Sequence, residues 1–202
     1  MAKIGIMGGT FDPIHLGHLI LGESAYSQLS LSEVLFMPAG DPPHKREREG
    51  RATNEQRTEM VRLAIEGNPH FSLSLLEMHE EGYSYTYRTL EMLNAQHPEN
   101  SYYFIMGADS LAYFDEWKEP QRIADAADLV VAVRDEIDLT PYIRKMESLF
   151  SARIHVLRTP NIEIASHDLR AWIAEGSSVR YYVPDAVREY IEREGIYCRS
   201  EK

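Results

Sequence analysis

The feature that most constrains this chain is the alternation of short, mainly apolar runs with segments of helical spacing. Such runs are typical of strands that are buried on both faces of a parallel sheet. They lie at residues 3–7, 34–37, 71–76, 102–106, 129–133 and 154–157. Helices are expected at residues 18–29, 86–96, 142–150, 168–175 and 184–194, with one more after the capping box that starts at Thr53. The pattern predicts an α/β fold with a doubly wound, Rossmann-like parallel sheet, helices on both faces and a small C-terminal helical segment.

Length and composition exclude several classes of protein. The 202 residues, 44% of them hydrophobic, predict a single domain spanning 1–202. No apolar stretch approaches the roughly 20 residues of a membrane helix, and Met1 leads directly into a strand, so we expect a cytoplasmic protein without a membrane partner. The single cysteine, Cys198, rules out an internal disulfide. A net charge of −11 argues against a nucleic-acid partner, whose binding surface would be basic.

The first strand is followed by Gly8, Gly9 and Thr10, and a helix is expected to begin a few residues later. Glycines let backbone N–H groups approach a ligand, and a helix N-terminus attracts phosphate. His15 and His18, three residues apart, would share one face of the first helical turn, where imidazoles can donate to phosphate oxygens. A metal-dependent hydrolase built on these histidines is an alternative. The dinucleotide and Walker glycine patterns are both absent, which disfavours a hydride-transfer enzyme or a P-loop kinase.

The segment Gly-Gly-Thr-Phe-Asp-Pro-Ile-His-Leu-Gly-His at 8–18 resembles the signature of the nucleotidyltransferases that carry a His-x-Gly-His motif. More narrowly, the chain resembles the bacterial nicotinate-nucleotide adenylyltransferase family over nearly its whole length. Further matching segments lie at 42–45, 84–86, 104–109, 117, 131–134 and 166–170. The resemblance implies transfer of AMP from ATP to nicotinate mononucleotide, giving deamido-NAD and pyrophosphate in NAD biosynthesis.

The resemblance assigns His15 and His18 to catalysis, with His18 stabilising the transition state at the α-phosphate. The residues expected to bind ATP or its phosphates share a position at strand ends and helix starts. They are Gly8, Gly9, Thr10, Phe11, His44, Lys45, Arg134, Ser166 and Arg170. Within the charged run 44–51, Lys45 is the preferred phosphate contact, whereas Arg51 is equally compatible with a solvated loop. Residues 160–202 would form a C-terminal helical part that completes the ATP site.

The acceptor nucleotide would be bound by a second group of residues. The resemblance places Tyr85, Thr86, Gly107, Asp109 and Trp117 there. Trp117, in a segment before Pro120, would stack on the pyridine ring, and the helix start at Thr86 would bind the nicotinate carboxylate. Thr86 and Asp109 could also serve simply as helix N-caps.

The segment 164–170 departs from the family pattern Ile-Ser-Ser-Thr-x-Ile-Arg. Ser166 and Arg170 match it, whereas Ala165 and His167 replace hydroxyl residues. Ser166 is expected to cap the helix, and Arg170 to bind the β- or γ-phosphate. The loss of two hydroxyls leaves a weakly catalytic nucleotide-binding protein as an alternative.

The same motifs bear on the alternative acceptor, the metal ion and the oligomeric state. Another adenylyl- or cytidylyltransferase of the superfamily, for example one with a phosphopantetheine acceptor, is the nearest alternative. Mg²⁺ is expected to arrive with ATP, because phosphates supply most of its ligands, so no dedicated metal site is predicted. A homo-oligomer is compatible with the sequence, which does not determine the oligomeric state.

Overall fold

The computed structural model describes residues 1–40, 50–79, 84–133 and 138–198. Its centre is a six-stranded sheet in the order β3-β2-β1-β4-β5-β6, and every neighbouring pair is parallel. The strands are β1 (Lys3–Gly9), β2 (Glu33–Pro38), β3 (Phe71–Leu73), β4 (Ser101–Gly107), β5 (Asp128–Val133) and β6 (Ile154–Arg158). The predicted parallel α/β sheet is therefore confirmed.

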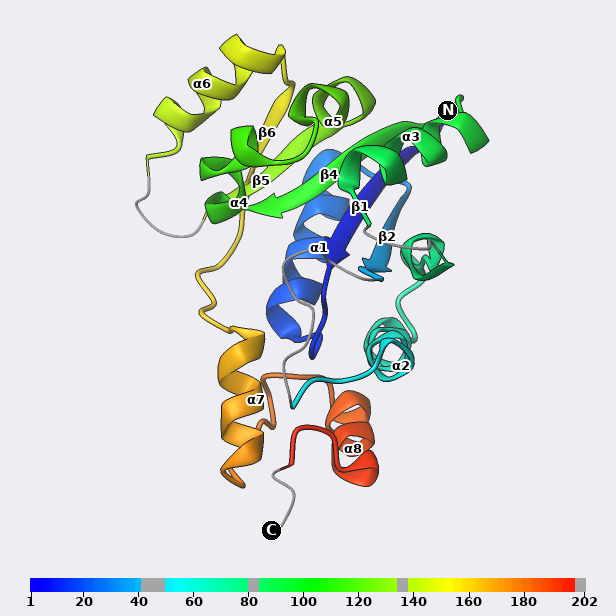
Figure 1. Cartoon of the computed structure of the whole chain (residues 1–202), viewed down its shortest axis with the longest axis vertical. Helices are drawn as coiled ribbons and strands as arrows, with labels where there is room; N and C mark the ends of the chain where they lie inside the picture. Colours follow the sequence, from blue (N-terminus) through cyan, green and yellow to red (C-terminus); the bar gives the residue numbers. More distant parts are fainter. Residues whose placement is uncertain (41–49, 80–83, 134–137, 199–202) are drawn as a thin grey trace.

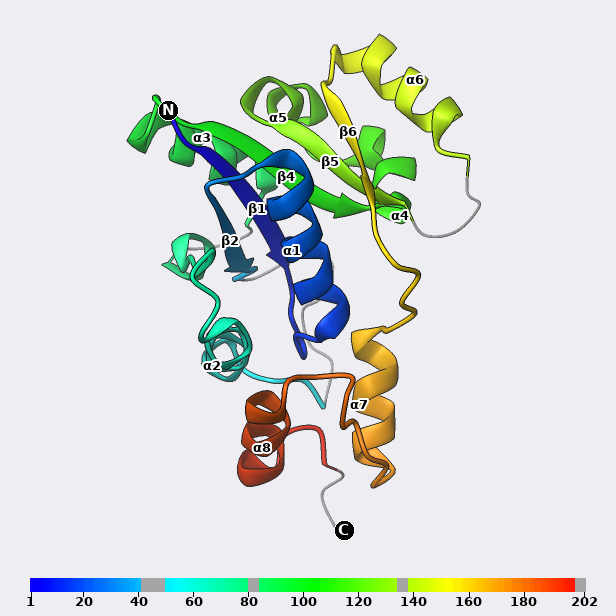
Figure 2. The same ribbon diagram turned by 180° about the vertical axis from the view of Figure 1, so that it is seen from behind.

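Helices cover both faces of this sheet (Figures 1 and 2). They are α1 (Leu16–Leu29), α2 (Asn54–Ile65), α3 (Thr86–Gln96), α4 (Ala108–Ala112), α5 (Pro120–Ala126), α6 (Thr140–Phe150), α7 (Ser166–Ala174) and α8 (Asp185–Glu194). Two short 3₁₀ turns, η1 (Leu76–His79) and η2 (Phe114–Glu116), precede α3 and α5. Helices α1 and α2 pack on one face, whereas α3, α4, α5 and α6 pack on the other.

Successive strand residues point into two different hydrophobic cores, because side chains alternate across a strand. On β1, Met7 belongs to the core beneath α1 and α2, whereas Ile6 belongs to the core beneath α3 to α6. On β5, Val130 and Val131 divide in the same way, and both are fully buried. This two-sided burial explains why the strands are uninterrupted apolar runs rather than alternating ones.

One expected strand is shorter than predicted, two short helices were not predicted, and the expected capping box is confirmed. The run 71–76 forms a strand only as far as Leu73, and its last residue starts η1 instead. Helices α4 and α5 were not expected, and Trp117 lies between η2 and α5. The capping box of α2 is present: Thr53 Oγ1 accepts from the Gln56 N–H at 3.2 Å, and Gln56 Oε1 accepts from the Thr53 N–H at 2.9 Å.

The C-terminal residues lie beyond the carboxyl ends of the strands (Figure 1). Leu169 of α7, with Val187 and Ile191 of α8, joins the same hydrophobic core as β1, β2 and α2. This packing places the start of α7 beside the loop between β1 and α1, where Ser166 Oγ donates to the Pro13 carbonyl at 3.0 Å. Within the described part of the chain, no helix is long and apolar enough to span a bilayer.

Candidate active site

Two clefts flank the carboxyl end of β1. This is the point where the strand order reverses, since β1 pairs with β2 on one side and with β4 on the other, and such points bind ligands in open α/β sheets. The first, here called the arginine cleft, has a volume of about 320 Å³ and is lined by Thr10, Phe11, Asp12, His18, Arg51, Ser166, His167 and Arg170. The second, here called the tryptophan cleft, has a volume of about 180 Å³, and its lining includes Gly8, Gly9, Glu77, Thr86, Phe104 and Trp117.

The end of β1 and the loop after it pass from one cleft to the other within four residues, 8–11. Gly8 and Gly9 line the tryptophan cleft, and Thr10 and Phe11 line the arginine cleft. Phe11 adopts a positive φ of 50° and is buried, with its ring 6.0 Å from that of Phe36. The backbone is therefore anchored at the point where the two clefts meet.

His15 and His18 lie together at the start of α1, as their spacing predicted. His15 is the N-cap residue and is buried, and the two rings stack with their centroids 3.7 Å apart. The His15 backbone N–H donates to Nδ1 of His18 at 3.2 Å. Because Nδ1 accepts this bond, the proton of a neutral His18 resides on Nε2, and that nitrogen is a donor. The rings of Phe11 and His18 pack edge-to-face with their centroids 5.0 Å apart, and this contact further orients the His18 ring.

Gly17 matters for a local reason. A Cβ at this position would lie 3.0 Å from Nδ1 and 3.1 Å from Cε1 of His15. Any side chain would therefore push the His15 ring away from its stacked position on His18. The small residue between the two histidines leaves room for their stacked pairing.

A buried carboxylate holds the arginine cleft together. Asp12 is 2% exposed, and its Oδ1 accepts from the Ala52 N–H at 3.1 Å and from the Tyr197 hydroxyl at 2.7 Å. Its Oδ2 lies 3.6 Å from Nη1 of Arg51 and 3.7 Å from Nη1 of Arg170. Arg170 Nη1 also donates to the Asp12 main-chain oxygen at 2.6 Å. Three segments distant in sequence thus meet at one carboxylate.

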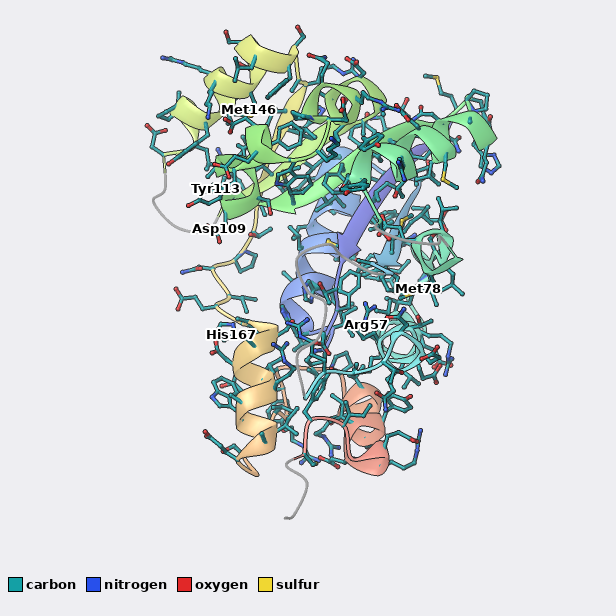
Figure 3. All side chains as sticks on the ribbon, in the orientation of Figure 1. Arg57, Met78, Asp109, Tyr113, Met146 and His167 are labelled. Atoms are coloured by element: carbon teal, nitrogen blue, oxygen red, sulfur yellow. The ribbon has the colours of Figure 1, made fainter. Side chains whose placement is uncertain are left out.

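Arg57 is a buried cation that joins the ends of β1 and β2. It extends from α2 toward the end of β1 (Figure 3), where Nη1 donates to the Thr10 carbonyl at 2.6 Å. Nη2 donates to the carbonyls of Ala39 at 2.7 Å and Gly40 at 3.2 Å, and to Asn54 Oδ1 at 2.6 Å. Burial lowers the pKa of the Arg57 guanidinium, and the charge of Asp12 opposes that shift.

The start of α7 differs from the expectation in one respect. Ser166 is the first residue of α7 rather than its cap; Ala165 occupies the N-cap position, and no side-chain cap is present among the described residues. Ser166 and Arg170 nevertheless both line the arginine cleft. His167 (Figure 3) also lines it, but the side chain is 74% exposed. Its Nε2 lies 2.9 Å from Asp168 Oδ1.

The tryptophan cleft has an aromatic wall and a helix N-terminus. Trp117 packs against Phe104 and Phe114, with ring centroids 6.0 and 5.7 Å apart, and remains half-buried. Thr86, the first residue of α3, lines the cleft, and the first N–H groups of a helix have no acceptor within it. The N-cap position belongs to Tyr85, so the N-cap role suggested for Thr86 is wrong.

Gly107 is the last residue of β4, and Asp109 comes two residues later, at the carboxyl end of the strand. Gly107 is the N-cap of α4, and Asp109 is an exposed residue in the first turn of that helix (Figure 3). The N-cap role considered for Asp109 is therefore wrong. The expected sites His44, Lys45 and Arg134 lie outside the described residues.

Sequence reasoning did not single out Asp12, Arg57 or Tyr197 as contributors to this site. Asp12 lies inside the glycine-histidine segment, which could have drawn attention to it. Arg57 and Tyr197 have no local motif, and only the tertiary structure brings them to the end of β1. Arg51, which was interpreted as equally compatible with a solvated loop, lines the arginine cleft.

The comparisons with known proteins agree with this geometry. A sequence model described as cytidylyltransferase-like matches residues 6–172. A relative from Lachnoclostridium phytofermentans, described as "Probable nicotinate-nucleotide adenylyltransferase", is 44% identical over 98% of this chain and 100% of its own length. A relative from Thermomicrobium roseum with the same description is 43% identical over 100% of this chain and 94% of its own length.

Solved structures support the fold. The nicotinic acid mononucleotide adenylyltransferase of Plasmodium falciparum, complexed with NaAD, superposes with a TM-score of 0.82 at 20% identity. The alignment covers 98% of each chain. At this identity the likeness concerns the fold alone, whereas the two relatives share more than 40% of their residues with this chain over nearly the full length. The chain therefore belongs to the cytidylyltransferase-like family and, within it, to the nicotinate-nucleotide adenylyltransferases.

Proposed function

We propose that this nucleotidyltransferase moves the adenylyl group of ATP to the phosphate of nicotinate mononucleotide, giving deamido-NAD and pyrophosphate. The observation that carries this proposal is the pair of clefts joined by residues 8–11. A cationic cleft suits a triphosphate, and an aromatic cleft suits a flat ring. The loop between them supplies backbone N–H groups where two phosphates would meet.

The reaction requires alignment more than proton transfer. A phosphate oxygen of the mononucleotide attacks the α-phosphorus of ATP, the new O–Pα bond forms, and the bond to the β-phosphate oxygen breaks to release pyrophosphate. The nucleophile is already ionised at neutral pH, so the site needs no strong base. Positioning and neutralisation of developing charge supply the acceleration.

Each candidate residue of the ATP site has a proposed role in this reaction. His18 donates from Nε2 to the α-phosphate in the transition state, and His15 holds the His18 ring and contributes to phosphate binding. Gly8, Gly9, Thr10 and Phe11 offer backbone N–H groups. Ser166 and Arg170, at the start of the C-terminal helical part, bind the β- or γ-phosphate, which is how residues 160–202 would complete the ATP site. His44, Lys45 and Arg134 are proposed as further phosphate contacts.

The acceptor is proposed to bind in the tryptophan cleft. Trp117 stacks on the pyridine ring, and the N–H groups at the start of α3, around Tyr85 and Thr86, receive the nicotinate carboxylate. Gly107 and Asp109 contact the ribose. A carboxylate at this helix start is favoured over an amide, because the helix end carries partial positive charge.

Mg²⁺ is proposed to enter with ATP. Among the described residues, no cluster of three His, Cys, Asp or Glu side chains could hold a metal ion. The carboxylate that lines the arginine cleft, Asp12, already accepts from Ala52 and Tyr197 and faces two arginines. The triphosphate oxygens would therefore supply most of the metal's ligands, and Mg²⁺ would neutralise part of their charge. A cytoplasmic location fits these substrates.

The test is a comparison of acceptors. The purified protein is incubated with Mg-ATP and, separately, nicotinate mononucleotide, its amide counterpart and phosphopantetheine, and pyrophosphate release is measured. We expect release with nicotinate mononucleotide and a much smaller rate with the amide. Release with phosphopantetheine alone, or with none of the three, would refute the proposal.

A further inference from the structure

The feature of interest is the hydrogen bond between Tyr197 and Asp12, which joins the end of the chain to the first loop. Tyr197 follows α8 and is 7% exposed, and its hydroxyl donates to Asp12 Oδ1 at 2.7 Å. The same hydroxyl lies 4.0 Å from the Met60 sulfur of α2. The position of the carboxyl group thus depends on a residue 185 positions away.

The other carboxylate oxygen faces the two guanidinium groups of the arginine cleft. Oδ2 lies 3.6 Å from Arg51 and 3.7 Å from Arg170, and it is buried without a hydrogen bond among the described residues. These separations exceed the roughly 2.7–3.2 Å of an N–H···O bond. Asp12 Oδ2 therefore attracts both cations by charge without a hydrogen bond to either, and Nη1 of Arg170 donates instead to the Asp12 main-chain oxygen at 2.6 Å.

We propose that Tyr197 is a positioning residue of the ATP site: through Asp12, it holds Arg51 and Arg170 as a matched pair for the triphosphate. This inference rests on the proposed function, since it assumes that the arginine cleft binds ATP. Without the Tyr197 hydroxyl, Asp12 could rotate and close a bidentate ion pair with one arginine. That arginine would then be lost to the phosphates.

Two observations separate this role from simple packing. Burial, together with the neighbouring Asp12, strongly raises the pKa of the Tyr197 hydroxyl, so the group stays protonated and remains a donor. The Asp12 side chain has its Oδ1 fixed by two donors, Tyr197 and the Ala52 N–H, and these set which oxygen faces the arginines. With an apolar contact in place of the hydroxyl, the Ala52 N–H alone would hold that orientation.

The experiment compares Tyr197→Phe with a matched control, Tyr102→Phe. Tyr102 is 4% exposed, and its hydroxyl donates to the Leu93 carbonyl at 2.9 Å, so each variant deletes one buried tyrosine hydrogen bond. Tyr102 lies at the amino end of β4, away from both clefts. Thermal unfolding is measured for both variants, together with the Kd of ATP without acceptor and the KM of each substrate.

We expect Tyr197→Phe to weaken ATP binding about fivefold, with little change in the KM of nicotinate mononucleotide. This is less than the roughly tenfold or more of a direct hydrogen bond to a charged group, because Tyr197 reaches the triphosphate only through Asp12. Tyr102→Phe should lose comparable stability and keep the wild-type Kd for ATP. Equal effects of the two variants on ATP binding, or an unchanged Kd in Tyr197→Phe, would overturn the inference.

A double-mutant cycle tests whether Tyr197 acts through Asp12. In an Asp12→Asn background, Tyr197→Phe should change the Kd of ATP less than twofold, since the carboxylate it orients is gone. An undiminished fivefold effect there would contradict the proposed route. Failure of the function is distinguishable: a wild-type protein that binds ATP but releases no pyrophosphate refutes the function, while the binding measurements still decide the role of Tyr197.

Discussion

The two clefts are built from different kinds of residue and from different spans of the chain. The arginine cleft brings together the loop after β1, Arg51 before α2 and the start of α7, so residues more than 150 positions apart meet there. The tryptophan cleft draws its wall from β1, β2, β4, α3 and the segment before it, together with Trp117 from the segment before α5. One gathers cations around a buried carboxylate, and the other gathers aromatic rings.

This difference follows from what each cleft is proposed to hold. A triphosphate carries several negative charges, which need cations and donors converging from several directions. A pyridine ring needs a flat apolar partner, which one or two side chains can supply. The comparison teaches that substitutions in one cleft should affect mainly one substrate, unless they alter the loop that joins the two.

The largest effect is expected at His18, in the arginine cleft beside the joining residue Phe11. His18→Ala removes the donor proposed to face the α-phosphate in the transition state, so kcat should fall by about 10²–10³. Because the ground-state contacts of ATP lie mostly elsewhere, its Kd should change less than about twofold. Single-turnover rates and ATP binding are measured, with His97→Ala, an exposed histidine at the end of α3, as the control. Equal losses in binding and turnover would contradict the transition-state role.

The next largest effect should be a rise in the KM for ATP alone. Arg170→Ala deletes a cation of the arginine cleft, and the KM for ATP should rise about 10- to 100-fold, the range of a hydrogen bond to a charged group. Arg170→Lys should recover only part of the loss, since lysine lacks the planar fork. The control is Arg180→Ala, an exposed arginine beyond α7. A parallel rise in the KM for nicotinate mononucleotide would show that the two clefts are not independent.

Local features of the site were predictable, because they depend on neighbours in sequence. The glycines at a strand end and the spacing of His15 and His18 place backbone N–H groups and two imidazoles together whatever the rest of the chain does. The same holds for the capping box at Thr53. The parallel sheet followed from the run of apolar strands alone.

The connections between distant segments were not predictable. Arg170 meets Asp12 across 158 positions and Tyr197 meets it across 185, and no periodicity encodes such pairs. Strand β3 ends at Leu73, opposite Phe36, although β2 itself continues to Pro38, because the chain turns into η1 from Leu76 instead of following β2. The apolar run continues beyond that point, so pattern alone overestimated the strand.

A third substitution tests the tryptophan cleft. Trp117→Ala removes the ring proposed to stack on the pyridine, and the KM for nicotinate mononucleotide should rise about tenfold, within the range of one stacked base. Trp117→Phe should cost less, since it keeps an aromatic face. The KM for ATP is measured in the same preparations and should stay near the wild-type value. A larger change for ATP than for the acceptor would reverse the assignment of the two clefts.

The smallest effect is expected at Ala165, where the start of α7 departs from the family pattern. Ala165 occupies the N-cap position with extended backbone angles, φ −119° and ψ 134°, which a serine can adopt. Ala165→Ser should therefore add the missing cap and raise the free energy of unfolding by about 0.5–1 kcal/mol. Ala171→Ser, an exposed substitution in the same helix, should slightly lower it, since serine has the weaker helix propensity.

Denaturant unfolding of both variants measures this difference, and kinetics measure its consequence. If Ser166 and Arg170 suffice for the triphosphate, the gain in stability should leave kcat and the KM for ATP within about twofold, because a cap bond satisfies the helix rather than the substrate. A many-fold rise in turnover on Ala165→Ser would instead mean that the natural chain lacks a phosphate-binding hydroxyl. The arginine cleft would then lack a group needed for full activity, and this result would support the hypothesis of a weakly catalytic nucleotide-binding protein.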